Sequence, residues 1–481
     1  MNAADTLALL PLILIAATAV MVMLGIACKR SHALAMVLTL VGLAAAFISI
    51  ADAVTLAPRQ VTSLLLVDRY ALFYIGLIIL SAIAVAVFSY RYFENHGGHR
   101  EELYLLLLLA TLGCAVLVAS SHFVSFLLGL EILSVSLYAM VAYLKDGALA
   151  LEAGTKYLIL ASASAAFLLF GAAIIYAVTG SMEFSRIREV SANGSGFPLL
   201  LAGIVLTITG IGFKLGVVPF HLWTPDVYQG APAPVAAFVA TTSKSAMVAL
   251  SLRYLLLSGA LQYRPIFLVF ATIAIASMCA GNLLALRQTN VKRILAYSSI
   301  AHFGYILVAF LAGGTMAIEA VSFYLVAYTV SILAAFGIVS VLSRSERDAD
   351  DLEDYRGLFW RRPVMAGVFT AALFSLAGIP ATMGFVGKFY VLDAGAAAAA
   401  WPLIIILVVT SVAGLFYYLR VVVALYSAPS ELATTQAPSV NHRGAWSGAF
   451  MLAVLALLLI WFGVYPTPLL HVIHATMSVP G

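Results

Sequence analysis

The chain has 481 residues, of which 63% are hydrophobic and only 10% are charged, and its mean hydropathy is +1.07. These values exclude an ordinary soluble domain and indicate an integral membrane protein. The net charge of +4 is scattered, without a basic cluster beside aromatic residues, so no nucleic-acid partner is expected. Cys28, Cys114 and Cys279 lie far apart and lack CxxC spacing, so we expect no redox centre on this chain.

Apolar stretches of about 20 residues, the length that spans a bilayer, recur along the whole chain. The first one lacks the basic start and the small-residue cleavage site of a signal peptide, so we interpret it as a membrane helix. The stretches are apolar on every face, which excludes a β-barrel. The predicted fold is an all-α integral membrane protein with about 14 transmembrane helices, near 7–27, 33–53, 70–90, 103–120, 123–143, 156–178, 197–218, 232–257, 265–285, 293–312, 316–342, 364–390, 402–426 and 446–464.

Lys and Arg gather in the loops that follow odd-numbered spans, such as Lys29, Arg30, Arg91 and Arg344. Because positively charged loops remain in the cytoplasm, these loops are predicted to be cytoplasmic. Both termini are then predicted on the opposite face, which is the periplasm if the host is a bacterium. The expected location is the bacterial inner (plasma) membrane.

Two spans contain helix-breaking residues next to a lysine. In the segment 210–235, Pro219 removes a backbone donor and its ring clashes with the carbonyl of Leu215, so the helix should be interrupted just past Lys214. The segment 375–392 contains three glycines and a proline before its own lysine and should break too. Irregular backbone at membrane depth is tolerated only where protein or water satisfies it, so we expect hydration beside both lysines.

The two broken helices are the seventh and the twelfth, and this odd separation makes them cross the membrane in opposite senses. Paired interrupted segments of this kind are typical of inverted-repeat transporters. The chain is therefore predicted to contain two inverted repeats, each with a Gly/Pro-broken helix. The expected domains are an N-terminal three-helix segment, a first half-channel, a second half-channel and a C-terminal helix, at 1–100, 101–260, 261–430 and 431–481.

Four lysines and one glutamate inside the predicted spans are the first candidates for a function: Glu131, Lys156, Lys214, Lys244 and Lys388. A charge at the bilayer centre costs about 2.5–3.5 kcal/mol on insertion scales, so such residues mark ion pathways by default. Burial and a neighbouring carboxylate act in opposite directions on a lysine's affinity for its proton, so a moving carboxylate can switch its charge. We therefore predict a proton relay of these residues, in which Glu131 is the partner of Lys214. Lys156 lies near a predicted helix start, where snorkelling of its side chain to the interface is the alternative.

Other polar residues are second choices for the relay, or structural alternatives. Lys292, Tyr297 and His302 are the second choices, with hydroxyl groups nearby on the tenth and eleventh spans at Ser298, Ser299, Tyr305, Tyr324 and Tyr328. Lys292 and Arg293 are also interpreted as marking the cytoplasmic end of the tenth span, and Arg420 as a structural anchor. His221 and His302 have no second ligand at metal-binding spacing, so no metal site is predicted.

Several motifs then point to a known family. The chain resembles the antiporter-like membrane subunits of complex I, and within them the subunit N group of the bacterial NADH:quinone oxidoreductase, whose mitochondrial counterpart is NADH dehydrogenase subunit 2. The resemblance covers nearly the whole chain, and a PFHxWxPDxxxxAP-like stretch is highly specific. The motifs are FKLGVVPFHLWTPDVYQGAPAPVAAF, SKSAM, QTNVKRILAYSSIAHFGYILVA, DLEDYRGLFWRRP and SLAGIPATMGFVGKFYVL.

The resemblance assigns a role to each relay residue. It implies that Glu131 is the fifth-helix glutamate that pairs with the seventh-helix lysine, Lys214, and that Lys244 is the connecting lysine of the eighth helix. Lys388 matches the twelfth-helix lysine of the second half-channel, and Lys156 a sixth-helix lysine. In the family these residues form a central hydrophilic axis, and quinone reduction elsewhere drives proton translocation.

Three functions therefore compete. The first is a proton-translocating subunit of an enzyme, NADH:quinone oxidoreductase, with NADH, FMN, iron–sulfur clusters and quinone on partner subunits and no cofactor-binding residue here, because the chain has no GxGxxG after a strand. Its partners would be antiporter-like neighbours, small helical subunits and membrane lipid. The alternative is a subunit of a multi-subunit sodium or potassium/proton antiporter. The third is a structural subunit whose buried charges only fix helix packing.

Overall fold

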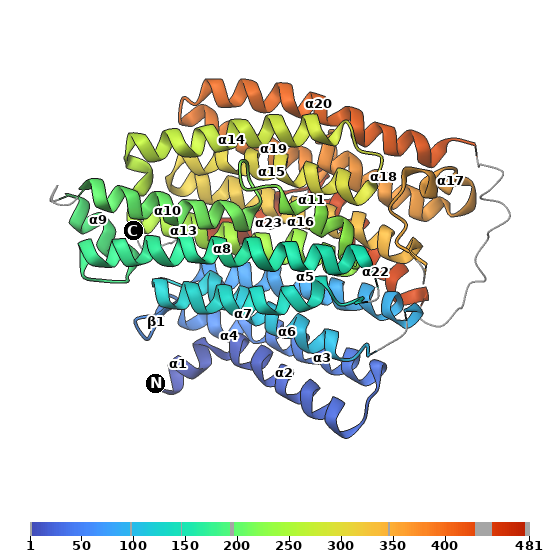
Figure 1. Ribbon diagram of the computed structural model, residues 1–481, viewed down its shortest axis with the longest axis horizontal. Helices are drawn as coiled ribbons and strands as arrows, with labels where there is room; N and C mark the ends of the chain where they lie inside the picture. The colour runs from blue at the N-terminus through green and yellow to red at the C-terminus, as the bar shows by residue number, and fades with distance from the viewer. Residues whose placement is uncertain are drawn as a thin grey trace.

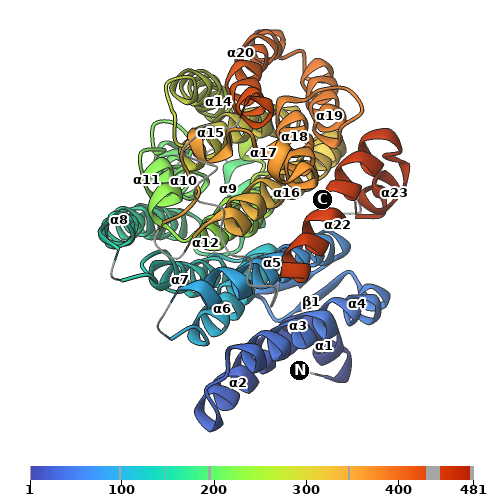
Figure 2. The ribbon, with the colours of Figure 1, turned by 90° about the vertical axis from the view of Figure 1, so that its right-hand side faces the viewer.

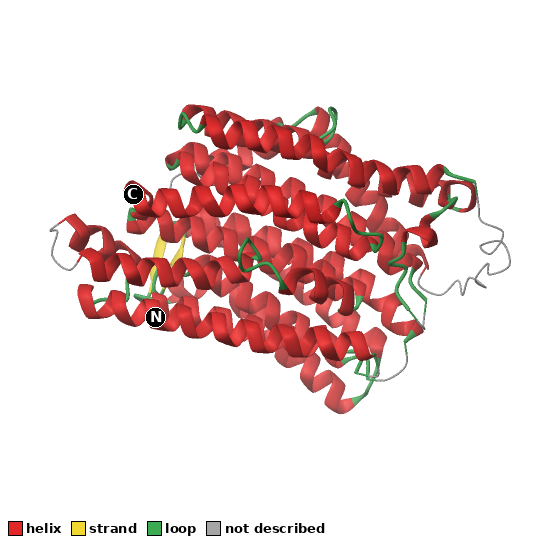
Figure 3. Ribbon diagram, turned by 45° about the horizontal axis from the view of Figure 1, so that its top comes forward, coloured by secondary structure: helices red, strands yellow, loops and turns green. Residues whose placement is uncertain are grey.

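The computed structural model describes residues 2–96, 99–145, 147–192, 197–344, 347–428 and 445–476. These residues are almost entirely helical, and their only sheet is a short antiparallel hairpin, β1 (Arg59–Val61) and β2 (Leu65–Val67) (Figure 3). Thirteen helices in the described part are long and apolar enough to cross a membrane. The predicted all-α, multi-pass membrane fold is confirmed.

The helices follow one another with short connections. In chain order they are α1 (Ala3–Ala8), α2 (Leu10–Cys28), α3 (His32–Ile48), α4 (Ile50–Leu56), α5 (Arg69–Asn95), α6 (Glu102–Ala119), α7 (Phe123–Val141), α8 (Ala148–Thr179), α9 (Phe184–Ala192), α10 (Phe197–Leu215), α11 (Trp223–Gly230), α12 (Ala233–Phe238), α13 (Lys244–Ser258), α14 (Arg264–Ala285), α15 (Val291–Ala312), α16 (Gly314–Leu342), α17 (Leu358–Arg361), α18 (Pro363–Ala377), α19 (Met383–Ala397), α20 (Trp401–Tyr426), α22 (Ala445–Val464) and α23 (Thr467–Thr476).

The long helices lie roughly parallel, and both termini lie at the same end of the bundle (Figure 1). An end-on view places α1–α4 at one edge and α20 at the opposite edge (Figure 2). Burial differs strongly among the helices: the α12–α13 span is 100% buried, whereas the α2 span is only 33% buried. A polar side chain on an enclosed helix must find its partners inside the protein, because lipid cannot supply them.

The structure agrees with the number of predicted spans and corrects some of their limits. The thirteen apolar spans and the broken helix α18–α19 together match the fourteen predicted spans. However, α8 begins at Ala148 and not at 156, because Glu152 and Lys156 form an (i, i+4) ion pair that continues the helix beyond its apolar part. A further short helix, α23, follows the last span. The predicted domain border at 430/431 lies outside the described residues.

Both predicted helix breaks are present. α10 ends at Leu215 and α11 begins at Trp223, while α18 ends at Ala377 and α19 begins at Met383. Each break uses a glycine in the left-handed region, Gly216 (φ +70°) and Gly378 (φ +80°), which a residue with a Cβ adopts only at a cost.

A third irregularity was not predicted from the sequence. Between α12 and α13 the chain makes a π-helical turn, Val239–Ser243, which ends immediately before Lys244. Such turns are rare and are frequently found at functional sites.

Candidate functional site

Lys214 lies at the C-terminal end of α10, where the first break begins, and it is only 5% exposed. Its Nζ donates a hydrogen bond to Ser134 Oγ on α7 at 2.7 Å and lies 5.7 Å from the centroid of the Tyr157 ring. Its immediate partners are therefore a neutral hydroxyl and an aromatic face.

Glu131 lies one helical turn before Ser134 on α7, but its side chain is exposed on the isolated chain. No ion pair joins Glu131 to Lys214 within 4.0 Å in the described part of the chain, but the two are near enough to interact electrostatically, so their partnership stays a prediction. Leu128 and Val135, which are 55% and 61% exposed, lie on the same face of α7 as Glu131. Glu131 is therefore on the outer surface of the isolated chain.

Lys244 is completely buried at the start of α13. Its Nζ lies 4.7 Å from the ring centroid of Phe303, 5.5 Å from that of Tyr228 and 5.7 Å from that of Trp223, so three aromatic rings enclose it. A Cβ at Gly216 would lie only 3.3 Å from Lys244 Nζ, so the left-handed glycine of the first break also permits this close approach.

A hydroxyl pair connects Lys244 with α15 and α16. Lys244 Nζ donates to Ser299 Oγ at 3.0 Å, and the Tyr328 hydroxyl donates to the same oxygen at 2.7 Å. With both lone pairs of Ser299 occupied, its own O–H is free to donate to the Tyr228 hydroxyl 3.3 Å away. The sequence offered Ser299 and Tyr328 only as members of a polar group, and the structure brings them together.

A small cavity, with room for about one water molecule, lies between Tyr328 and Lys388. His302 lies on its wall between two tyrosines, with Nδ1 2.6 Å from the Tyr324 hydroxyl and Nε2 3.0 Å from the Tyr418 hydroxyl. Both ring nitrogens of His302 therefore have hydroxyl partners, which link α15 with α16 and α20. The other lining residues are Ala327, Ser331, Ser375, Leu376 and Gly384.

Lys388 lies on α19 at the second break and is 8% exposed. Its Nζ donates to the Ala377 carbonyl and to Ser411 Oγ, each at 2.7 Å. The Ala377 carbonyl is the last of α18, which the break leaves without a helical partner. The interruption of the helix therefore creates the acceptor that holds the lysine.

Lys156 differs from the other lysines. Its side chain is 43% exposed and forms ion pairs with Glu152 and Asp226, each at 2.7 Å. Arg293 also contacts Asp226, at 2.9 Å. Burial alone would raise the pKa of Asp226, which lies between two apolar spans, but Lys156 and Arg293 outweigh burial and hold it below its usual range. Lys156 thus belongs to a charge network at the edge of the protein.

The second-choice residues Lys292 and Tyr297 and the expected anchor Arg420 have different surroundings in the structure. Lys292 is only 1% exposed and pairs with Asp348 at 2.5 Å while donating to the Ala231 carbonyl at 2.7 Å, so the loop before α17 covers it. Tyr297 contacts Arg293 through its ring, 6.0 Å from the guanidinium carbon. Arg420 donates to the carbonyls of Leu286 and Gln288 at the end of α14, as expected of an anchor.

Sequence reasoning missed one buried ion pair. Asp68 and Arg253 are 2.7 Å apart and almost fully buried, and Asp68 also caps the first turn of α5. Asp68 gave a weak signal because it lies at the start of an apolar stretch, where charged residues are common. Arg253, inside the predicted span 232–257, was overlooked.

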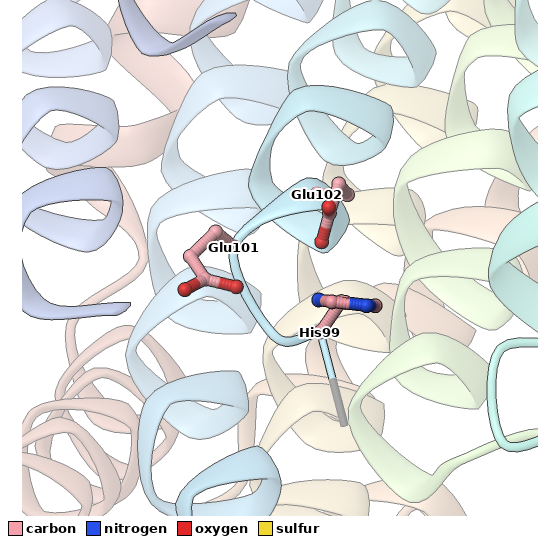
Figure 4. Close-up of side chains that lie close together, drawn as sticks. All are labelled: His99, Glu101 and Glu102. Carbon is pink, nitrogen blue, oxygen red and sulfur yellow. The ribbon is translucent and has the colours of Figure 1, made fainter. Parts of the chain in front are cut away.

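One group of side chains has the composition of a metal site. His99, Glu101 and Glu102 approach one another at the start of α6 (Figure 4). The Arg30 guanidinium contacts His99 and lies 3.1 Å from Glu102, so a cation already neutralises this group. We interpret it as an ion-pair cluster on the surface.

The fold and the buried lysines define a multi-pass membrane protein with a polar axis through its core, and comparisons with known proteins agree. The model of the NADH:quinone oxidoreductase/Mrp antiporter transmembrane family matches residues 120–414. NADH-quinone oxidoreductase subunit N of Ectopseudomonas mendocina is 48% identical over 480 residues, which cover 98% of this chain and 97% of the relative. The chain therefore belongs to the NADH:quinone oxidoreductase/Mrp antiporter family, in its subunit N group, as the sequence motifs indicated.

Solved structures show the same architecture. A chain of respiratory complex I from Thermus thermophilus matches with a TM-score of 0.83 and 33% identity, over 97% of this chain and all of that one. A chain of the Mrp complex from a Dietzia species matches with a TM-score of 0.86 over 99% of this chain and 97% of its own length, but with 18% identity it supports the fold alone.

Proposed function

We propose that the chain is a membrane-arm subunit of NADH:quinone oxidoreductase and moves protons across the membrane through Glu131, Lys214, Lys244 and Lys388. Electron transfer from NADH to quinone, with FMN and iron–sulfur clusters on other subunits, supplies the energy. The observation that carries this proposal is the row of buried lysines along the axis of a chain 48% identical to subunit N.

The partners of the three buried lysines favour a relay over a structural role. Lys214, Lys244 and Lys388 donate to hydroxyl or carbonyl oxygens, and no carboxylate lies within 4.0 Å of any of them in the described part of the chain. The buried arginine of α13 instead has a carboxylate partner, Asp68. A buried charge is normally paired, so lysines without such a partner are suited to reversible protonation.

The exposed face around Glu131 supports a contact with another subunit. An ionised carboxylate facing lipid at mid-membrane costs about 2.5–3.5 kcal/mol on insertion scales, so a protein surface is the favourable neighbour. We place the chain in the bacterial inner membrane with both termini in the periplasm, on the basis of the positively charged loops at the opposite face. Lys156 and Lys292 would act at the edge of the relay.

The test is purification of the tagged chain from its native host in mild detergent, with identification of the copurifying chains and an assay of NADH:quinone reduction. We expect iron–sulfur and flavin subunits together with inhibitor-sensitive activity. Purification with membrane subunits only, and cation/proton exchange driven by a pH gradient, would instead establish the antiporter function.

The subunit contact is tested by cysteine crosslinking from the Glu131 face, in a variant in which the exposed Cys28 is replaced by serine. A cysteine at Leu128 or Val135 should crosslink to a neighbouring subunit. A cysteine at Val409, which is 63% exposed on α20, serves as the control on the opposite edge. Labelling of Leu128→Cys by a lipid-soluble maleimide with no protein crosslink would show that lipid covers this face.

A further inference from the structure

Two aromatic rings stand between the first two lysines of the axis. The Tyr157 ring lies next to Lys214, and the Trp223 ring lies next to Lys244, each with its centroid 5.7 Å from the lysine Nζ. The two rings pack against each other with centroids 4.9 Å apart. The contacts therefore run from ammonium to ring, from ring to ring and from ring to ammonium, without an intervening polar atom.

This stretch offers no hydrogen-bonded route for a proton. Trp223 has a single polar hydrogen, on Nε1, and donates it to the Phe213 carbonyl at 2.8 Å. Lys214 and Lys244 donate to Ser134 and Ser299, and not to the Tyr157 hydroxyl. The Trp223 and Tyr157 side chains are both 2% exposed. A dry constriction of this kind blocks ions by excluding water.

The surroundings of Trp223 allow this barrier to open. Trp223 is the first residue of α11, directly after the break at 216–222. A Cβ at Gly216 would overlap Thr224 Oγ1 and would lie 3.3 Å from Lys244 Nζ and 3.5 Å from Trp223 Cζ2, so these three groups border one small space. Thr224 Oγ1 is buried and has no hydrogen-bond partner, which makes it a ready partner for a water molecule.

We propose that Trp223, packed on Tyr157, is an aromatic gate between Lys214 and Lys244. In the closed state described here, the indole holds the two lysines apart and is fixed by the Phe213 carbonyl. When the indole leaves that carbonyl, water enters beside Thr224 and connects the two ammonium sites. Trp223 is a positioning residue, because it holds no transferred proton. This inference rests on the proposed proton translocation.

The alternative is a purely structural role, in which the Trp223 ring only fills space in the protein core at the start of α11. It predicts that removal of the ring lowers stability or assembly and leaves the number of protons moved per electron unchanged. The gate predicts a change in that number, because protons then pass between the lysines without being timed by the catalytic cycle.

The experiment uses the whole complex in sealed liposomes and measures proton uptake and NADH oxidation together. In Trp223→Ala we expect the ratio of protons to NADH to fall about twofold or more while quinone reduction continues, because the water-excluding constriction is gone. Trp223→Phe keeps an aromatic ring and should restore the ratio. Phe369→Ala, which removes another fully buried ring on α18, should leave the ratio unchanged.

A wild-type ratio in Trp223→Ala overturns the gate. If Trp223→Ala fails to assemble, Tyr157→Leu removes the other ring and should lower the ratio in the same way, and a normal ratio in that variant also overturns the proposal. Lys214→Arg distinguishes failure of the relay from failure of the gate. Normal pumping in Lys214→Arg would disprove the relay itself. Loss of pumping in Lys214→Arg together with a wild-type ratio of protons to NADH in Trp223→Ala would disprove only the gate.

Discussion

The two links of the buried axis are built differently. Lys244 is connected toward Lys388 by hydroxyl groups, through Ser299 and Tyr328 and then a small cavity lined by His302 and Lys388. Lys244 is separated from Lys214 by two packed aromatic rings. A hydroxyl chain passes protons whenever its members reorient, but an aromatic contact must first open. The difference places the control point in the first half of the molecule.

The two helix breaks show the same contrast. At the first break, the Phe213 carbonyl accepts from both the Gly216 backbone N–H and the Trp223 indole, while Lys214 donates to Ser134 on another helix. At the second, the freed Ala377 carbonyl accepts from Lys388 itself. The same sequence feature, a Gly/Pro interruption beside a lysine, therefore holds an aromatic ring in one half and, in the proposed relay, a proton-carrying lysine in the other.

The largest effect should follow from replacing a relay lysine by arginine, which keeps the charge but cannot release its proton. For Lys214→Arg and Lys388→Arg we expect assembled complex in which pumping falls about a hundredfold, the low end of what a positioned proton-transfer group contributes. Proton uptake by liposomes checks this. Lys29→Ala, an exposed lysine after α2, is the matched control. A structural role for these lysines predicts that the arginine variants pump normally.

Removing one hydroxyl from the second link should have the next largest effect. Tyr328→Phe leaves the ring in place but removes the donor to Ser299, and a buried group without its partner costs about 1–3 kcal/mol, so we expect roughly tenfold slower pumping. Stopped-flow proton release measures the rate. The control is Tyr355→Phe, the same substitution at another buried tyrosine, whose hydroxyl donates to the Ala349 carbonyl. Equal rates in the wild type and Tyr328→Phe would show that protons bypass this hydroxyl.

Alanine at the two left-handed glycines should have smaller effects, mainly on stability. Gly216→Ala and Gly378→Ala each place a Cβ at positive φ, which costs about 1–2 kcal/mol. The added methyl would also lie 2.4 Å from Thr224 Oγ1 at Gly216 and 2.7 Å from Lys388 Cδ at Gly378, so a neighbouring side chain must shift in each variant. Because Lys388 itself is displaced in Gly378→Ala, we expect this variant to lose more pumping than Gly216→Ala. Thermal unfolding of the purified complex gives the stability, with Gly367→Ala, where a Cβ meets nothing, as the control. Identical losses in all three variants would contradict this.

The smallest effect is expected at Lys156. Its ion pairs are partly exposed, and pairs of this kind contribute little, so Lys156→Ala should change pumping less than about twofold. The same liposome assay compares it with Lys214→Ala. A loss as severe as that of Lys214→Ala would place Lys156 inside the relay and not at its edge.

The sequence alone determined the membrane fold, the spans, the two broken helices and the identities of the buried lysines. These features are local, because hydropathy over about 20 residues and Gly/Pro next to a lysine can be read without neighbours. The start of α8 was wrong because a charged, ion-paired turn continues that helix beyond its apolar part.

Only the tertiary structure decided which groups contact one another. Ser134, Ser299 and Ser411 are ordinary helix residues in the sequence, and each became a lysine partner because helices distant along the chain pack side by side. Glu131 lies on the outside of the chain, although its segment is as apolar as its neighbours, because the rotation of α7 within the bundle fixes the direction of each side chain. The hydropathy of a segment indicates how deep a residue lies in the membrane, whereas helix packing decides which way its side chain points. The order of the proposed relay and its aromatic barrier therefore follow from packing alone.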